Sequence, residues 1–346
     1  MIVVPAAGPD VDPGRQARLP LGAVAGGAVV VTLLRPLSWA LGLAGFLAGG
    51  GVVVVAWPVV VLPTLTGLQN ALGGPISSLV FGAPSSWLVA LIAGGIVSGI
   101  GLVILGTLAG AWAERQGIAV ALDAASEDGM GLAQVDLDGA PGAARVALVR
   151  LMSLAPVVIA FALAWRPLYD ATYHELILPA NLSTPLPLRV IREAPLPVIG
   201  IMTAWLLADA AAAVGVRRLV LERRRVFEAW LLGWADLVRR PHRVVPTAIV
   251  GLLVLVLLTG PALAAAAIGW GRVRDILVAG RDPVIMIGAV LVWVAIWLGC
   301  LVLAGVGSAI RAAMWALEVP TRRDEPPAIA GGPEPGRSPE APASPR

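Results

Sequence analysis

The sequence predicts an all-α fold, a polytopic bundle of about six transmembrane helices. Hydrophobic residues make up 58% of the 346 residues and charged residues 14%, whereas soluble domains are nearer half apolar and about 25% charged. The apolar residues also gather in runs of about twenty, the length that a helix needs to cross the ~30 Å hydrocarbon core of a bilayer. One or two further amphipathic helices are expected at the membrane surface.

The arginines predict the orientation in the membrane. All 25 basic residues are arginines, and eight of them lie in residues 216–243. Arginine-rich short loops stay on the cytoplasmic side, so we expect this segment inside, and alternating the spans from it places 19 arginines inside and 6 outside. Both termini are then cytoplasmic, in a multi-pass protein of the bacterial cell membrane. The net charge of +3 therefore reflects topology, and we expect no nucleic acid partner.

The predicted elements follow the apolar runs. Residues 1–18 and the proline-rich tail 319–346 are expected to be disordered. Residues 19–34 are too few to span and are expected to form an interfacial or partly buried helix. Residue 35 precedes a proline, which disfavours helical backbone and ends this helix. The integral membrane domain, 19–318, contains six predicted spans: 37–62, 87–113, 146–165, 196–216, 244–270 and 283–309.

Three loops carry the remaining polar residues. Residues 63–86 hold no charge and are compatible with either a re-entrant segment or a surface loop. Residues 114–143 hold six carboxylates but lack the rest of a calcium-binding loop, so a solvated inner loop is expected. The long outer loop contains Asp170, His174 and Glu175, here called the outer-loop cluster. One histidine and two carboxylates are weak support for a metal, so we predict no metal, cofactor or catalytic residue.

A helix over about 217–240 is predicted to be amphipathic. Its apolar residues recur at i, i+3, i+4 and i+7 and form one stripe. Two interpretations are open: the stripe enters the bilayer boundary while arginines reach anionic lipid headgroups, or it packs on the protein's own bundle. The candidate interface residues are Trp230, Trp234, Arg224, Arg225, Arg239 and Arg240.

Four glycines line one face of the second span. Gly95, Gly99, Gly106 and Gly110 lie within about 60° of one another on a helix. A smooth face of this kind lets another helix approach closely in lipid. We expect this seam to serve internal packing, with contact to another subunit as the alternative.

Asp209 is the only carboxylate well inside a predicted span. A charge at the centre of a spanning helix costs about 2.5 to 3.5 kcal/mol on insertion scales, so a partner is expected. At 1.5 Å per residue, Asp209 lies about 12 Å from the inner boundary, and Arg150 lies about 7 Å from it on the preceding antiparallel span. We therefore predict an ion pair between Asp209 and Arg150. A structural role for this pair is favoured over a role as a proton or ion relay.

Two similar breaks suggest internal repetition. Leu34-Arg35-Pro36 precedes the first span, and Arg239-Arg240-Pro241 precedes the fifth. Residues 16–116 and 222–316 are then either parallel repeats or share only the chance similarity of apolar sequence.

Three segments carry a resemblance to known sequences: RPLSWALGLAGFLAGGGVVVVAWPVVVLPT, ELILPANLSTPLPLRVIREAP and RRLVLERRRVFEAW. With them, the chain resembles a family of multi-pass bacterial membrane proteins over about residues 35–320. The resemblance implies a helical membrane bundle. It brings no catalytic residues, because no activity of that family is known.

Three functions are open. The sequence favours a structural or accessory membrane component that binds other membrane subunits. The alternative is a transporter or permease subunit with Asp209 in or near its pathway. In support, Glu228-Ala229 followed by Gly233 resembles the coupling loop of binding-cassette importer permeases, although the spacing is one residue short and the Ile-x-Leu-Pro that follows is missing. The third is a membrane enzyme using the outer-loop cluster, which lacks a nucleophile beside a base.

Overall fold

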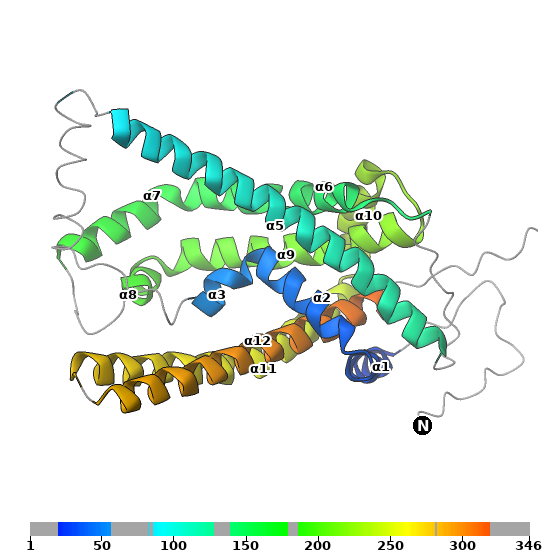
Figure 1. Cartoon of the computed structure of the whole chain (residues 1–346). Helices are drawn as coiled ribbons and strands as arrows, with labels where there is room; N and C mark the ends of the chain where they lie inside the picture. Colours follow the sequence, from blue (N-terminus) through cyan, green and yellow to red (C-terminus); the bar gives the residue numbers. More distant parts are fainter. Residues whose placement is uncertain are drawn as a thin grey trace, which may run out of the picture.

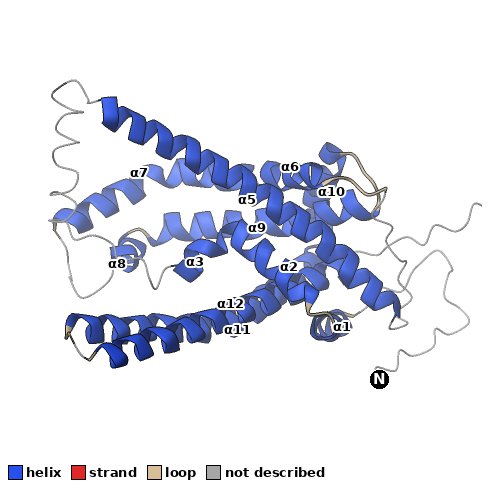
Figure 2. Cartoon of the chain, in the orientation of Figure 1, coloured by secondary structure: helices blue, strands red, loops and turns tan. Residues whose placement is uncertain are grey.

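The computed structural model describes residues 20–56, 82, 86–127, 139–178, 186–280 and 282–318. These residues form helices and no strand (Figure 2), so the predicted all-α class is confirmed. Six helical segments are long and apolar enough to cross a membrane. The predicted disordered ends and nearly all of residues 63–86 lie outside the described residues. The helices are α1 (Leu21–Leu34), α2 (Leu37–Phe46), the π-helical turn η1 (Leu47–Gly51), α3 (Val52–Ala56), α5 (Ser86–Glu127), α6 (Ala143–Ser153), α7 (Ala155–Ile177), α8 (Leu186–Glu193), α9 (Pro195–Leu221), α10 (Val226–Arg239), α11 (Pro241–Val278) and α12 (Pro283–Glu318).

The chain forms three hairpins with the same order of elements (Figure 1). Each hairpin begins with a short helix, α1, α6 or α10, and continues past a break into a pair of longer segments. The pairs are α2–η1–α3 with α5, α7 with α9, and α11 with α12. The pattern suspected in the first and third hairpins thus recurs in the middle one. The breaks fall at Arg35-Pro36, Leu154-Ala155-Pro156 and Arg240-Pro241.

The buried core lies at the end of the bundle where the three short helices gather. We call this the inner end, after the predicted orientation, and the opposite one the outer end. Here α1 packs on α12, α6 on α5 and α9, and α10 on α9. Toward the outer end, α5 and the α11–α12 pair diverge (Figure 1). Only 6% of the most apolar 18-residue window is buried in each of α5, α11 and α12. Core side chains include Val24, Ile118, Leu122, Val146, Leu219 and Met314.

Small residues bring α9 and α10 into close contact. A Cβ added at Gly233 would overlap the carbonyl oxygen of Ala211, and one added at Gly215 would lie 3.0 Å from that of Ala229. Each helix thus offers two small residues four apart, the arrangement that lets helix backbones approach in membranes. This contact fixes α10 against the inner half of α9.

Several predicted boundaries are wrong. Helices α7, α11 and α12 extend past the predicted spans to Ile177, Val278 and Glu318. Helix α5 continues through Glu127, into the segment predicted as a solvated loop, because Ile118 and Leu122 extend its apolar face into the core. Helix α9 continues through Leu221, so the amphipathic helix does not begin at residue 217. It begins at Val226.

The first span is interrupted. Its helical path passes through η1, where Gly50 has φ 98°. Residues with a Cβ rarely adopt this backbone conformation, so glycine is required here. The predicted span 37–62 is helical to Ala56, and residues 57–62 lie outside the described residues.

Gly233→Ala should weaken the contact between α9 and α10. The added methyl group has no room against the Ala211 carbonyl, and overpacking of this kind costs about 1 to 3 kcal/mol. We expect a lower Tm of the purified protein in detergent. Gly271→Ala is the control, because a Cβ there meets nothing within 4 Å. Equal Tm values for the two variants would contradict the close contact.

Candidate functional site

Five charged side chains meet at the inner end of the bundle. They come from four helices that are far apart in the sequence, and we call them the charge network. Its members are Glu114 of α5, Arg150 of α6, Asp209 and Arg217 of α9, and Arg311 of α12.

Glu114 is the centre of the network. Arg150 binds it through two parallel bonds, from Nε to Oε2 at 2.8 Å and from Nη2 to Oε1 at 2.7 Å. This bidentate geometry is the strong form of an arginine–carboxylate pair. Arg217 Nη1 donates a further bond to Oε1 at 2.8 Å. One carboxylate therefore ties α6 and α9 to α5.

Asp209 is bound from two sides. Arg150 Nη1 lies 3.1 Å from its Oδ1, and Arg311 Nη2 donates to its Oδ2. The structure thus brings together the two residues of the predicted pair and adds a second arginine from α12. Each oxygen of this carboxylate already has an arginine donor.

Arg217 is the most deeply buried charge, with 1% of its side chain exposed. Besides Glu114 it donates to the backbone oxygens of Ala213 at 2.9 Å and Ala312 at 3.2 Å. A buried charge needs such partners to offset the loss of hydration. Three arginines face two carboxylates, so the carbonyl oxygens help to balance the excess positive charge.

The network is suited to holding helices together rather than to catalysis or proton transfer. Both carboxylates are occupied by arginines, and arginine does not lose its proton in proteins. None of the five members is a histidine, a cysteine or a hydroxyl nucleophile. A Cβ added at Gly251 would lie 3.0 Å from Arg311 Cγ, so α11 also packs directly against the network.

The outer-loop cluster is assembled differently from the prediction. Asp170 is exposed and lies 4.0 Å from Arg166. His174 and Glu175 instead meet Glu193 of α8, with one ligand atom from each within 4.8 Å of the others. Glu175 is buried and accepts a bond from Arg189 Nη1 at 2.8 Å. That cation occupies the carboxylate and disfavours a metal beside it, so the group favours packing between α7 and α8.

Helix α10 combines features of both predicted alternatives. Its buried edge, Ala229, Gly233 and Leu237, packs on the bundle. Phe227 and Val238, from the predicted stripe, are 59% and 77% exposed. Of the candidate interface residues, Trp230 and Trp234 are half-buried and Arg224, Arg225, Arg239 and Arg240 are exposed.

The predicted internal glycine seam has a neighbour in the described part of the chain at one of its four positions. A Cβ added at Gly95, Gly99 or Gly106 would meet nothing within 4 Å, whereas one at Gly110 would lie 2.8 Å from Ala48 Cβ. The reason is the divergence of α5, whose outer half has no neighbour along this face in the described part of the chain. The alternative, contact with another subunit, stays a prediction.

Sequence reasoning missed Glu114, Arg217 and Arg311 as network members. It assigned all three to inner loops because they lie at the ends of apolar runs. The overlooked signal is that apolar and small residues continue on both sides, as in SAIRAAMWAL around Arg311 and AWAERQGIAVAL around Glu114.

Comparisons of the chain with protein families, curated proteins and solved structures found no match. The functional argument therefore depends on the geometry of this structure.

Removing one charge of the network should be more harmful than removing a matched pair. Asp209→Asn leaves Arg311 buried without its carboxylate, and breaking a buried pair costs about 3 to 5 kcal/mol. We expect Asp209→Asn and Arg311→Gln to lower the free energy of unfolding individually, and the double variant to lose about 0.5 to 3 kcal/mol less than the sum. Additive losses would contradict the network. Glu127→Gln is the control, since Glu127 is exposed and pairs with the exposed Arg35, and such pairs contribute about 0 to 1 kcal/mol.

Proposed function

We propose that the protein is an accessory component of a membrane assembly, and that it binds a transmembrane helix of another membrane subunit along the outer half of α5. The supporting observation is the contrast between the two ends of the bundle. The inner end is held by the charge network and a packed core. On the outer half of α5, large apolar side chains such as Val97, Leu102 and Leu105 are 67 to 71% exposed.

The glycine face on this exposed arm favours a helix as the partner. A Cβ added at Gly95, Gly99 or Gly106 would meet nothing within 4 Å in the described part of the chain. Lipid tails cover apolar side chains as well as protein does, so exposure alone selects no partner. Two glycines four residues apart, Gly95 and Gly99, in contrast allow the close backbone contact that drives helix association in lipid.

The transporter alternative has weaker support. The two small residues of its coupling-loop resemblance, Ala229 and Gly233, are used in the contact between α9 and α10. Asp209, the suggested pathway residue, has arginine donors on both carboxylate oxygens. An ion or substrate would have to displace one of these arginines.

The proposed setting is the bacterial cell membrane, with the inner end and both termini cytoplasmic. The excess of arginines predicted inside supports this orientation. Helix α10 then lies at the cytoplasmic surface, where exposed Phe227 and Val238 enter the bilayer boundary and its flanking arginines contact anionic headgroups.

Gly99→Leu should release the partner without unfolding the protein. Leucine at this position fills the glycine face, and its Cβ meets nothing within 4 Å in the described chain, so Tm should stay unchanged. We expect the size of the assembly extracted from native membranes in polymer-bounded lipid discs to fall. Gly101→Leu is the matched control, because Gly101 is also open and lies about 200° away around the helix. A single assembly size in the wild type and both variants would reject the proposal.

The orientation can be tested by cysteine labelling. Cys300 is the single cysteine, so Cys300→Ser gives a cysteine-free background. Asp170→Cys and Arg225→Cys then offer matched sites, since both native residues are polar and exposed. A membrane-impermeant maleimide should label position 170 in intact cells and position 225 only after permeabilisation. The opposite pattern would invert the topology.

A further inference from the structure

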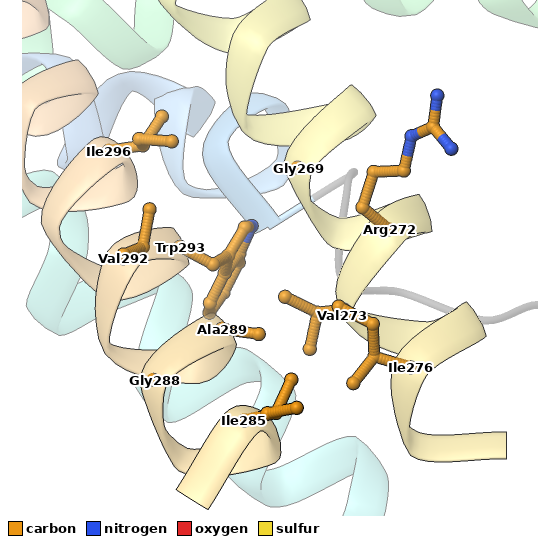
Figure 3. Close-up of a pocket in the computed structure, with 10 residues that line it drawn as sticks. All are labelled: Gly269, Arg272, Val273, Ile276, Ile285, Gly288, Ala289, Val292, Trp293 and Ile296. Atoms are coloured by element: carbon orange, nitrogen blue, oxygen red, sulfur yellow. The ribbon is translucent and has the colours of Figure 1, made fainter. Parts of the chain in front are cut away.

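A groove lies between α11 and α12 near the outer end of the bundle (Figure 3). Its volume is about 340 Å³, at the small end of the ~300 to 1,000 Å³ typical of ligand pockets. The glycines on both helices, Gly269 and Gly288, leave the space that side chains would otherwise fill. The lining is apolar apart from one arginine, and it includes Val273, Ile276, Ile285, Val292, Trp293 and Ile296.

Arg272 is the single charged residue of this lining. It is exposed, and Figure 3 shows its guanidinium pointing away from α12, beyond the apolar side chains. No acidic group in the described part of the chain forms an ion pair with it. An apolar groove with a cation at its rim is complementary to an amphiphile that joins a hydrocarbon chain to an anionic group.

The position of the groove along the helices matches a membrane surface. Gly251 lies against Arg311 in the charge network. Twenty helical residues, about 30 Å, separate Gly251 from Gly271 on α11, which is the thickness of the hydrocarbon core. Arg311 lies two residues past the predicted sixth span, 283–309, and so marks the inner surface. Arg272 is then about 30 Å away, at the outer surface and at the depth of lipid phosphates.

Trp270 supports the same depth, because it ends the predicted fifth span, 244–270. Trp270 and Trp293 lie with their ring centroids 5.0 Å apart, and Trp293 stacks on Trp297 at 6.3 Å. Tryptophan is enriched at the level of the headgroups. The Trp293 Nε1 donates to the Ala266 oxygen at 2.9 Å, which holds this side chain as one wall of the groove.

We propose that this groove is a binding site for an anionic phospholipid of the outer leaflet. One acyl chain lies in the groove between α11 and α12, and the headgroup phosphate pairs with Arg272. The site is separate from the glycine face of α5 and does not depend on the proposed partner.

The test measures lipid retained by the purified full chain. Protein in mild detergent is incubated with phosphatidylglycerol or with phosphatidylcholine of the same acyl chains, and bound lipid is counted by native mass spectrometry. The wild type should retain about fivefold more phosphatidylglycerol, the effect of one arginine at an anionic surface. Arg272→Gln should lose this preference. Gly288→Leu should lose both lipids, because the leucine fills the groove while its Cβ meets nothing within 4 Å.

Arg274→Gln is the matched control. Arg274 is exposed on the same helix and lies about 200° around it from Arg272, so this variant should keep the preference. If the Arg272 and Arg274 variants retain equal amounts of phosphatidylglycerol, the proposed pairing of the phosphate with Arg272 is wrong. If Gly288→Leu retains as much lipid as the wild type, the acyl chain does not lie in the groove between α11 and α12. Neither result depends on the fold, because Arg272 and Gly288 are both exposed and a Cβ at Gly288 meets nothing within 4 Å.

Discussion

The arrangement of the inner end depends on the carboxylate of Glu114. It binds Arg150 and Arg217 together, and through them it connects α5 of the first hairpin to α6 and α9 of the middle one. Asp209 extends the link to Arg311 and the third hairpin. In a membrane, apolar contact alone distinguishes poorly between helix partners, because lipid is as apolar as leucine. Bonds between buried charges make this distinction, since a wrong partner leaves a charge uncompensated.

Close packing of small residues complements this electrostatic link. Gly233 and Gly215 bring α10 and α9 together, and Gly42 and Gly305 do the same for α2 and α12. The contact between α9 and α10 also carries the ion pair of Arg218 with Asp236. The outer half of α5 exposes large apolar side chains instead, so this surface is left to lipid or to another subunit. The division between a fixed inner end and divergent outer arms follows from this distribution.

Much of the fold could be predicted because hydropathy and arginine position report directly on spanning helices. The contact between Asp209 and Arg150 could be predicted for a related reason, because the depth of a residue in the membrane can be counted along its helix. Glu114, Arg217 and Arg311 were not recognised as members of the same site. A charge at the end of an apolar run usually marks a loop, and only the tertiary structure shows that these helices continue past it. The glycine pattern likewise predicted a smooth face on α5 without showing what lies opposite.

The same physical reasoning separates the candidate functions. Residues that would perform transport or catalysis need a free lone pair, an exchangeable proton or an open coordination position. In this structure Asp209 has both oxygens bound, and Glu175 is held by Arg189. These carboxylates are thus engaged with arginines. What stays available is surface: the glycine face of α5 and an apolar groove with Arg272 at its rim. Such features recognise helices and lipids, which is why the geometry favours a protein that binds within the membrane over one that moves or converts a substrate.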